Sequence, residues 1–380
     1  MKNKLLKYLL KDNPDKVVSK TGIVLRRIIS PVFRRIMMLS TKGKLIIKDS
    51  EKKENGRKII YACTHGFHDD IILSMSAANK HAYLLYGNIK DFYNTYHGIG
   101  LWTNGVILVD RTDPQSRKSA IKKMIHTINL GGSIIMFPEG TWNLKESLPI
   151  LELHLGIYEV AKETDSIIIP IATYFDHGIN YANKGKPLNI TKIDKETQNI
   201  IISNNIKLIN KCIDLLIYNT NIEKYILNNL LLMIDILKQD KDISKLEEIS
   251  TNLIKEIEEN RINADETLPL FSILERVENI LKLISKQEKI VQINKLRDEL
   301  ATLKWNIYTE AHYDDFSKDY WKNHIEKLIS TTNGFYNANE EKASEYKNPE
   351  YFSSEEVFRQ LDNVTVTREN AKILKLTKNK

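Results

Sequence analysis

The chain reads IIYACTHGFHDDIILSMSAA over residues 59–78, and this stretch decides the fold. Its first five residues are apolar and short enough for a buried strand, and residues 71–78 can continue as a helix. The turn between them holds His65 and two carboxylates, Asp69 and Asp70. A neutral imidazole accepts a proton while a carboxylate fixes its tautomer, so the pair is a candidate base and orienting group. Helix spacing alone would favour Asp69, at i+4, and a His near an Asp is also common in ordinary turns.

An alternation of short apolar runs and helical patterns continues downstream. Strands are predicted over residues 82–86, 106–109, 133–137 and 167–173, with a loop and a last strand over 185–190. A helix is predicted over 115–129, with four basic side chains facing outward: Arg117, Lys118, Lys122 and Lys123. Alternating strands and helices predict an α/β domain over residues 57–192. His65, Arg111 and Glu139 would each follow a strand end, where functional groups of such folds gather.

Composition favours an ordered intracellular-type protein. The chain has 380 residues, 42% of them hydrophobic, and its two cysteines, Cys63 and Cys212, suggest neither a disulfide framework nor a Cys-based zinc site. A reducing compartment fits. No apolar run reaches the roughly 18 residues of a membrane span, and charges early in the chain make a poor signal peptide.

Positive charge is concentrated at the N-terminus. Residues 1–50 hold 13 Lys and Arg against 3 Asp and Glu, a net of +10, whereas the whole chain carries +7. Two short amphipathic helices are predicted, over 21–30 and 31–39, with Ser30 capping the second. We therefore expect residues 1–56 to be a basic segment that associates with an anionic membrane surface. The alternative is a helix docked on the core with exposed arginines. No aromatic platform accompanies the charge, so no nucleic-acid partner is expected.

Four blocks of the sequence together resemble the glycerolipid acyltransferases, the family of lysophosphatidate (1-acyl-glycerol-3-phosphate) acyltransferases. The first is His65 with Asp70, and the second is Gly105 to Arg111, a glycine and an apolar strand ending in Asp-Arg. The third, Phe137 to Thr141, reads Phe-Pro-Glu-Gly-Thr without a change, and the fourth is Ile168-Ile169-Pro170-Ile171. The resemblance covers about residues 20–192. It implies a sheet flanked by helices, preceded by N-terminal amphipathic helices.

The resemblance implies transfer of a fatty acyl group from a thioester to a lysophospholipid hydroxyl in phospholipid biosynthesis. His65 would be the general base and Asp70 its orienter, and Arg111 would hold an acceptor phosphate. The substrate-binding turn would be formed by Glu139, Gly140, Thr141 and Trp142. Neither a metal nor a cofactor is implied; acyl carrier protein or coenzyme A would bring the acyl group. The expected location is peripheral, on the cytoplasmic face of the cell membrane.

Trp142 is the main departure from the family pattern, which usually has Arg after Phe-Pro-Glu-Gly-Thr. Lys145 could supply a charge, but without the guanidinium fork. Trp142 could pack on an acyl chain or a sugar, or be a partly buried packing residue. A second departure, Thr64 before the histidine, keeps a hydroxyl. His68 beside His65 and Asp69 resembles a partial metal site, but no further ligand cluster accompanies it, and we expect a turn residue.

The second half shows helical spacing and no catalytic motif. A helical insertion of four or five helices is predicted over residues 193–296, with breaks at 219–221, 238–242 and 260–269, and a helical C-terminal region over 297–380. Three functions remain open at this stage. They are acylation of a lysophospholipid, acylation of a glycan or glycolipid hydroxyl by the same chemistry, and non-catalytic lipid binding.

Overall fold

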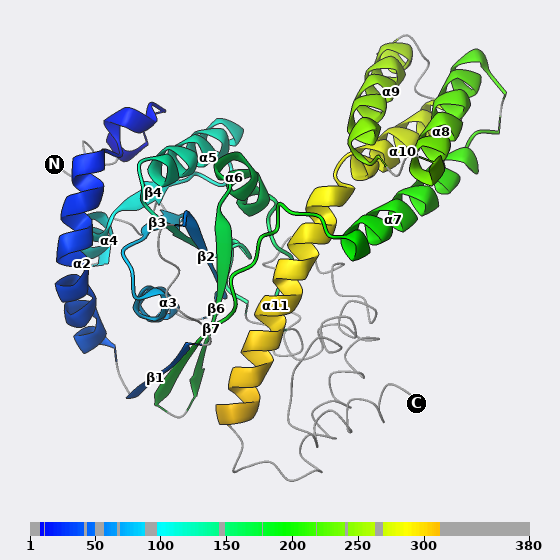
Figure 1. Ribbon diagram of the computed structural model, residues 1–380. Helices are drawn as coiled ribbons and strands as arrows, with labels where there is room; N and C mark the ends of the chain where they lie inside the picture. The colour runs from blue at the N-terminus through cyan, green and yellow to red at the C-terminus, as the bar shows by residue number, and fades with distance from the viewer. Residues whose placement is uncertain are drawn as a thin grey trace. The chain divides into compact units, whose positions relative to one another are not determined.

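The computed structural model describes residues 8–10, 12–41, 44–49, 57–66, 69–87, 97–143, 149–176, 178–217, 219–239, 242–262 and 269–311 (Figure 1). The chain divides into two compact units. Unit 1 comprises residues 1–191 and 295–380, and unit 2 comprises residues 192–294. Each unit is described separately below.

Unit 1 is built on one seven-stranded sheet, drawn at the centre of the blue-to-green part of Figure 1. Its strand order is β1-β7-β6-β2-β5-β3-β4. The strands are β1 Lys44–Asp49, β2 Ile59–Cys63, β3 Tyr83–Tyr86, β4 Val106–Leu108, β5 Ile134–Met136, β6 Ile167–Asp176 and β7 Ile179–Lys184. Every neighbouring pair is parallel except β6 with β7. The carboxyl ends of β2, β3, β4 and β5 therefore meet at one edge of the sheet.

Helical crossovers connect the parallel strands, as parallel pairing requires. They are α3 Asp70–Ala78, α4 His97–Asn104, α5 Pro114–Asn129 and α6 Gly156–Thr164. Alternate residues of β2, namely Ile59, Tyr61 and Cys63, share a buried cluster with α3. Ala172 of β6 instead contacts α11 (Gln287–Ala311) through Leu303 and Ile307. Because Ile169 and Ile171 of β6 belong to the α3 cluster, α3 and α11 cover opposite faces of the sheet.

The predicted α/β class is confirmed, and two strand predictions need correction. Residues 185–190 were expected to form the last strand, but only an isolated bridge joins Ile168 to Leu188 there. The last strand is β7, which precedes them and reverses on β6. The second correction concerns residues 44–49, which form edge strand β1 inside the expected N-terminal segment. The partner of β1 is β7, so pairing across the sheet, and not local pattern, decides both strands.

The N-terminal helices are one helix, α2 Lys20–Ser40, with Pro31 in its interior. The two-helix prediction, with Ser30 as a cap, is therefore wrong. Proline removes one backbone hydrogen bond, but both halves of α2 pack on the same domain, which keeps the helix continuous. Arg26 Nη1 in the first half donates to Tyr83 Oη at 3.1 Å, and Phe33 in the second half approaches Gly100 of α4.

Lys123 of α5 is not on the outer face that its sequence pattern predicted. It is 1% exposed, and its Nζ donates to the carbonyl of Leu9 at 3.1 Å. The N-terminal segment, including the short helix η1 (Pro14–Lys16), packs against α5 and covers it. Burial lowers the pKa of Lys123.

Unit 2 is all helical. Its helices are α7 Lys195–Ile213, α8 Asn221–Gln239, α9 Ser244–Ile262 and α10 Pro269–Ile284, followed by the first residues of α11. Buried apolar residues of the four helices share one core, which includes Ile209, Leu230, Leu253 and Val277. The predicted helical segments coincide with these helices, and the predicted breaks coincide with the ends of the helices. Of the predicted C-terminal region, α11 is described to Ala311, and residues 312–380 lie outside the described part of the chain.

Candidate active site

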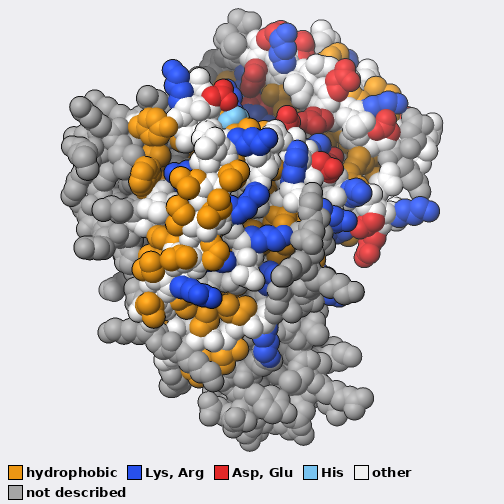
Figure 2. Space-filling model, turned by 60° about the vertical axis from the view of Figure 1, so that its left-hand side comes forward, with side chains coloured by type: hydrophobic (Ala, Val, Ile, Leu, Met, Phe, Trp, Pro, Cys, Tyr) orange, Lys and Arg blue, Asp and Glu red, His pale blue; other side chains and the backbone are white. Residues whose placement is uncertain are grey.

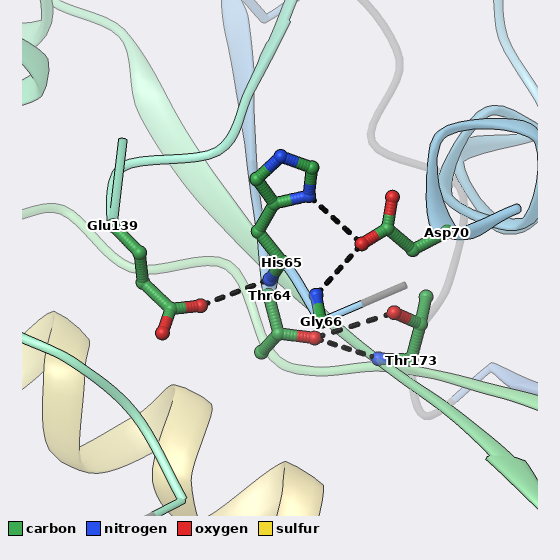
Figure 3. A network of polar contacts seen from close by, with 6 residues as sticks. All are labelled: Thr64, His65, Gly66, Asp70, Glu139 and Thr173. Atoms are coloured by element: carbon green, nitrogen blue, oxygen red, sulfur yellow. Dashed lines mark hydrogen bonds and ion pairs between the residues drawn. The ribbon is translucent and has the colours of Figure 1, made fainter. Parts of the chain in front are cut away.

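The site begins where β2 ends and α3 starts. His65 Nδ1 lies 2.8 Å from Asp70 Oδ2, and the same oxygen accepts the backbone N–H of Gly66 at 2.8 Å (Figure 3). Asp70 is fully buried, while the His65 side chain is 17% exposed. With the Nδ1 proton donated to Asp70, Nε2 keeps its lone pair and can take a proton from a bound hydroxyl. The carboxylate that orients His65 is therefore Asp70, five residues on, and not its neighbour Asp69.

Thr64 fixes the end of β2 against the end of β6. Its Oγ1 accepts the backbone N–H of Thr173 at 2.9 Å and lies 3.4 Å from the Thr173 hydroxyl. Both side chains are buried. The Thr64 hydroxyl thus anchors the backbone next to His65. A residue without a hydroxyl at this position would leave the buried N–H of Thr173 unpaired.

Glu139 contacts the backbone of His65 from the other side. It is 4% exposed, and its two oxygens accept two backbone amides, His65 N–H at Oε1 and Leu151 N–H at Oε2, both at 2.9 Å. Figure 3 shows the carboxylate approaching the backbone of His65 from the side opposite Asp70. Burial raises the pKa of Glu139, and the charge of Lys304 and the two backbone bonds act against that rise. The contacts make Glu139 a positioning residue for His65, whereas its predicted contact with substrate remains a prediction.

Lys304 is one of the residues near the site that the sequence did not reveal. It comes from α11, far beyond the last family block, yet its ammonium interacts electrostatically with Glu139 and Asp70. Burial lowers its pKa, and the two carboxylates act in the opposite direction. Leu303 beside it packs on Ala172, and Gly185 leaves room for Leu303 and Glu299. Helical periodicity predicts that α11 has a buried face but not which carboxylates that face meets.

Arg111 lies past β4, at the same edge of the sheet as His65. Its Nη1 donates to the carbonyl of Gly140, and its guanidinium lies against Gly87, where a Cβ would collide with it. Arg117 of α5 donates to the Arg111 carbonyl at 2.6 Å. The charges of both arginines also help to lower the pKa of His154, after burial. The structure thus gathers Arg111, Arg117 and His154 around the turn that follows β5.

That turn is closed by a bond from Gly140 N–H to the Phe137 carbonyl at 3.0 Å. Gly140 has φ +69°, and a Cβ there would collide with the His154 ring. Thr141 follows and is partly exposed. The peptide is tied to His65 through Asn143, whose N–H donates to the His65 carbonyl at 2.6 Å. A glycine is therefore required at 140 both by its backbone angle and by space.

Trp142 lies beside His65. Its ring meets the His65 ring edge-on, with centroids 5.9 Å apart and an interplanar angle of 83°. Phe137 lies on another side of the imidazole, with ring centroids 4.5 Å apart. Trp142 remains 41% exposed, and its predicted contact with substrate stays a prediction. A residue wholly packed into the core would not keep this exposure.

Two further residues considered in the sequence fall outside the structure described. His68 and Lys145 lie outside the described residues. Within the described ranges, no three His, Cys, Asp or Glu side chains cluster in a way that could hold a metal ion. None of the described helices is long and apolar enough to cross a bilayer. Asn143 and His154, like Lys304, are site residues that no spacing rule predicts.

Comparison with known proteins identifies the core of unit 1. Residues 44–174 match the family model described as Acyltransferase. No curated protein matches the chain. Among solved structures, the crystal structure of the 1-acyl-sn-glycerophosphate (LPA) acyltransferase PlsC from Thermotoga maritima aligns with a TM-score of 0.36 and 14% identity. The alignment covers 62% of this chain and 87% of that one. The matched range runs from β1 into β6 and contains His65, Asp70, Arg111 and Glu139.

Proposed function

We propose that this chain transfers a fatty acyl group from an acyl thioester to a lysophospholipid hydroxyl. Its residues 44–174 are an acyltransferase domain, so the chain is an acyltransferase. The observation that carries this proposal is the contact of His65 Nδ1 with Asp70 at 2.8 Å, which leaves Nε2 as the base. The thioester is that of acyl carrier protein or coenzyme A. The acceptor class is lysophosphatidate, since Arg111 and Arg117 supply two guanidinium groups beside the site.

The reaction needs no covalent enzyme intermediate. The acceptor hydroxyl gives its proton to His65 Nε2 as its oxygen attacks the thioester carbonyl carbon. Asp70 stabilises the imidazolium that forms. The tetrahedral intermediate then collapses with loss of the thiolate, which takes the proton from His65. Ester and free thiol are the products, and the base returns to its starting form.

Substitution of the base pair tests this chemistry. Purified protein is incubated with a labelled acyl thioester and lysophosphatidate, and ester formation is measured by mass. His65→Ala should lower kcat by about 10²–10⁴-fold, the usual contribution of a general base. Asp70→Asn should also lower kcat strongly, whereas the adjacent control Asp69→Asn should not. If His65→Ala transfers acyl groups at the wild-type rate, the proposed role of His65 is wrong.

Trp142 supports a second acceptor class. An exposed indole edge-on to the base suits stacking on a sugar ring, and it stands where the family pattern has a phosphate-binding Arg. Acylation of a glycan or glycolipid hydroxyl by the same steps is therefore the alternative. The assay above separates the two when a mixed lipid extract and a glycolipid fraction are offered as competing acceptors and the acylated products are identified.

Helix α2 supports attachment to a membrane surface. Val24, Leu25, Ile28, Val32, Ile36 and Leu39 are between 47% and 86% exposed. Figure 2 shows apolar side chains gathered on the face where α2 comes forward, bordered by Lys and Arg. An apolar stripe next to basic side chains suits the interface of a bilayer that contains anionic lipid. We propose peripheral binding at the cytoplasmic face of the cell membrane, which would bring lipid acceptors to the site.

A further inference from the structure

A second candidate site lies at the opposite end of the strands from His65. A cavity of about 630 Å³ opens at the amino ends of β2, β3 and β5, whereas His65 and Glu139 follow strand carboxyl ends. Ile59 at the start of β2, His81 before β3 and Ser133 before β5 line it. One face of α2 closes it, through Arg27, Ser30 and Arg34. None of the catalytic or acceptor-binding residues discussed above contributes to its walls.

The described residues that line this cavity carry positive charge. Five of them are Lys or Arg, namely Arg27, Arg34, Arg57, Lys58 and Lys80, and none of the described lining residues is Asp or Glu. Arg27 Nη2 donates to the Gly131 carbonyl at 2.7 Å, and Arg34 Nη1 to the Met75 carbonyl at 3.5 Å. Both guanidinium groups thus find backbone oxygens, which carry no full charge to balance them. Burial lowers the pKa of Arg34, because removal from water disfavours the charged form.

Two buried polar atoms in the wall have no partner within the described part of the chain. Ser30 Oγ and His81 Nδ1 have no hydrogen bond among the described residues, although the side chains are only 4% and 7% exposed. The His81 ring is fixed by its other nitrogen, because Nε2 lies 2.5 Å from the Asn104 carbonyl and so must donate to it. Nδ1 is then an acceptor, while Ser30 can donate or accept. An unpaired buried polar group is unfavourable, so a ligand that satisfies both atoms is favoured.

We propose that this cavity is a binding site for a phosphate-bearing anion. A phosphate carries up to two negative charges and several acceptor oxygens, which matches several guanidinium and ammonium groups better than a single carboxylate does. One phosphate oxygen accepts from Ser30 Oγ, and a P–OH or neighbouring hydroxyl donates to His81 Nδ1. The group belongs either to the headgroup of an anionic phospholipid at the surface that α2 contacts or to a soluble phosphate ester. The chemistry of recognition is the same for both.

The proposal is tested by calorimetric titration of the full chain with pyrophosphate at constant ionic strength. The wild type should bind it saturably. Arg34→Gln should weaken the affinity at least about tenfold, because it removes a charge-assisted bond. Arg35→Gln is the matched control: it is the next residue of α2, is exposed and does not line the cavity. It should bind as the wild type does.

A second variant tests the site independently, in case Arg34→Gln does not fold. Arg57 and Lys58 are exposed at the cavity rim, and Arg57→Gln with Lys58→Gln should also weaken binding while leaving the circular dichroism spectrum unchanged. The proposal is overturned if pyrophosphate binds no better than acetate. It is equally overturned if the folded rim variant and Arg35→Gln bind pyrophosphate alike.

Vesicles distinguish the two sources of phosphate. Phosphatidylcholine vesicles that contain phosphatidate should displace pyrophosphate if the natural ligand is a lipid headgroup, whereas pure phosphatidylcholine vesicles should not. If the protein keeps its bound pyrophosphate in the presence of both kinds of vesicle, the site is assigned to a soluble phosphate ester. Either result supports an anion site, because both require the saturable binding that the rim variant weakens.

Discussion

Glu139 holds His65 by its backbone: Oε1 accepts the His65 N–H at 2.9 Å, while Oε2 accepts the Leu151 N–H at the same distance. The carboxylate of the Phe-Pro-Glu-Gly-Thr block therefore ties the turn after β5 to the turn after β2. Asp70 orients the ring of the same histidine. Two carboxylates thus hold one histidine, Asp70 through the histidine side chain and Glu139 through the histidine main chain.

Glu139→Gln should lower kcat more than it changes KM. The amide keeps the size of the side chain but offers only one acceptor oxygen, so one of the two buried N–H groups loses its partner at a cost of about 1–3 kcal/mol. We expect kcat to fall about ten- to a hundredfold and thermal stability to fall as well. Glu163→Gln, on the exposed side of α6, is the control and should alter neither. A raised KM with unchanged kcat would instead indicate direct substrate contact.

Lys304→Met should move the acid limb of the pH–rate profile to higher pH. The charge of Lys304 opposes the rise that burial causes in the Glu139 pKa. Without that charge the Glu139 pKa rises further, so the carboxylate takes up a proton at a higher pH and can no longer accept with both oxygens. Activity is thus lost earlier as pH falls. Lys304→Arg should restore the profile in part, and an unshifted acid limb in Lys304→Met would separate Lys304 from the site.

Arg111→Ala should raise the KM for a phosphorylated acceptor by about ten- to a hundredfold, the value of a charge-assisted hydrogen bond to phosphate. Arg111→Lys should recover only part of this because it loses the fork. Trp142→Arg should improve the use of lysophosphatidate. The measurement is a KM series with phosphorylated and glycolipid acceptors. If Trp142→Arg abolishes activity while Arg111→Ala is harmless, the acceptor is not a phosphate monoester.

Removing the apolar stripe of α2 should release the protein from vesicles. Arg26, Arg27 and Arg34 contact the folded domain, so charge reversal there would also disturb packing. Ile28, Val32 and Ile36 are 59–70% exposed and are better targets. Their joint change to Ser should weaken binding to anionic vesicles in a sedimentation assay without lowering the thermal stability. Added salt should weaken wild-type binding too, since it screens the basic side chains. Vesicle binding equal to wild type would contradict attachment through α2.

Gly140→Ala should destabilise the protein more than Gly178→Ala. Both glycines have positive φ, +69° and +78°, where a side chain costs about 1–2 kcal/mol. Only at Gly140 would the new Cβ also meet the His154 ring, whereas at Gly178 the space is open. The difference between the two free energies of unfolding measures that clash. Equal losses would show that His154 can move aside freely.

The sequence by itself determined the parts of this protein that rest on local pattern. Apolar runs predicted β2, β3, β4, β5 and β6, because a buried parallel strand must be continuously apolar. Helical periodicity predicted α5 and the helices of unit 2 with their breaks. The contact between His65 and Asp70 was also predicted, since the two residues lie close together in the chain. Their catalytic role and the contact of Glu139 with substrate stay predictions.

Tertiary structure decided what depends on partners distant in sequence. Strands β1 and β7 form because each finds an edge to pair with, and α2 stays continuous through Pro31 because the folded domain packs along both halves. Lys123 is buried because the N-terminal segment covers it. The meeting of Lys304 with Glu139, and of α2 with the amino ends of the strands around a basic cavity, joins residues far apart in the sequence. The periodicity of the sequence does not predict such contacts, because they are stabilised by packing and charge interactions between residues that are distant in the chain.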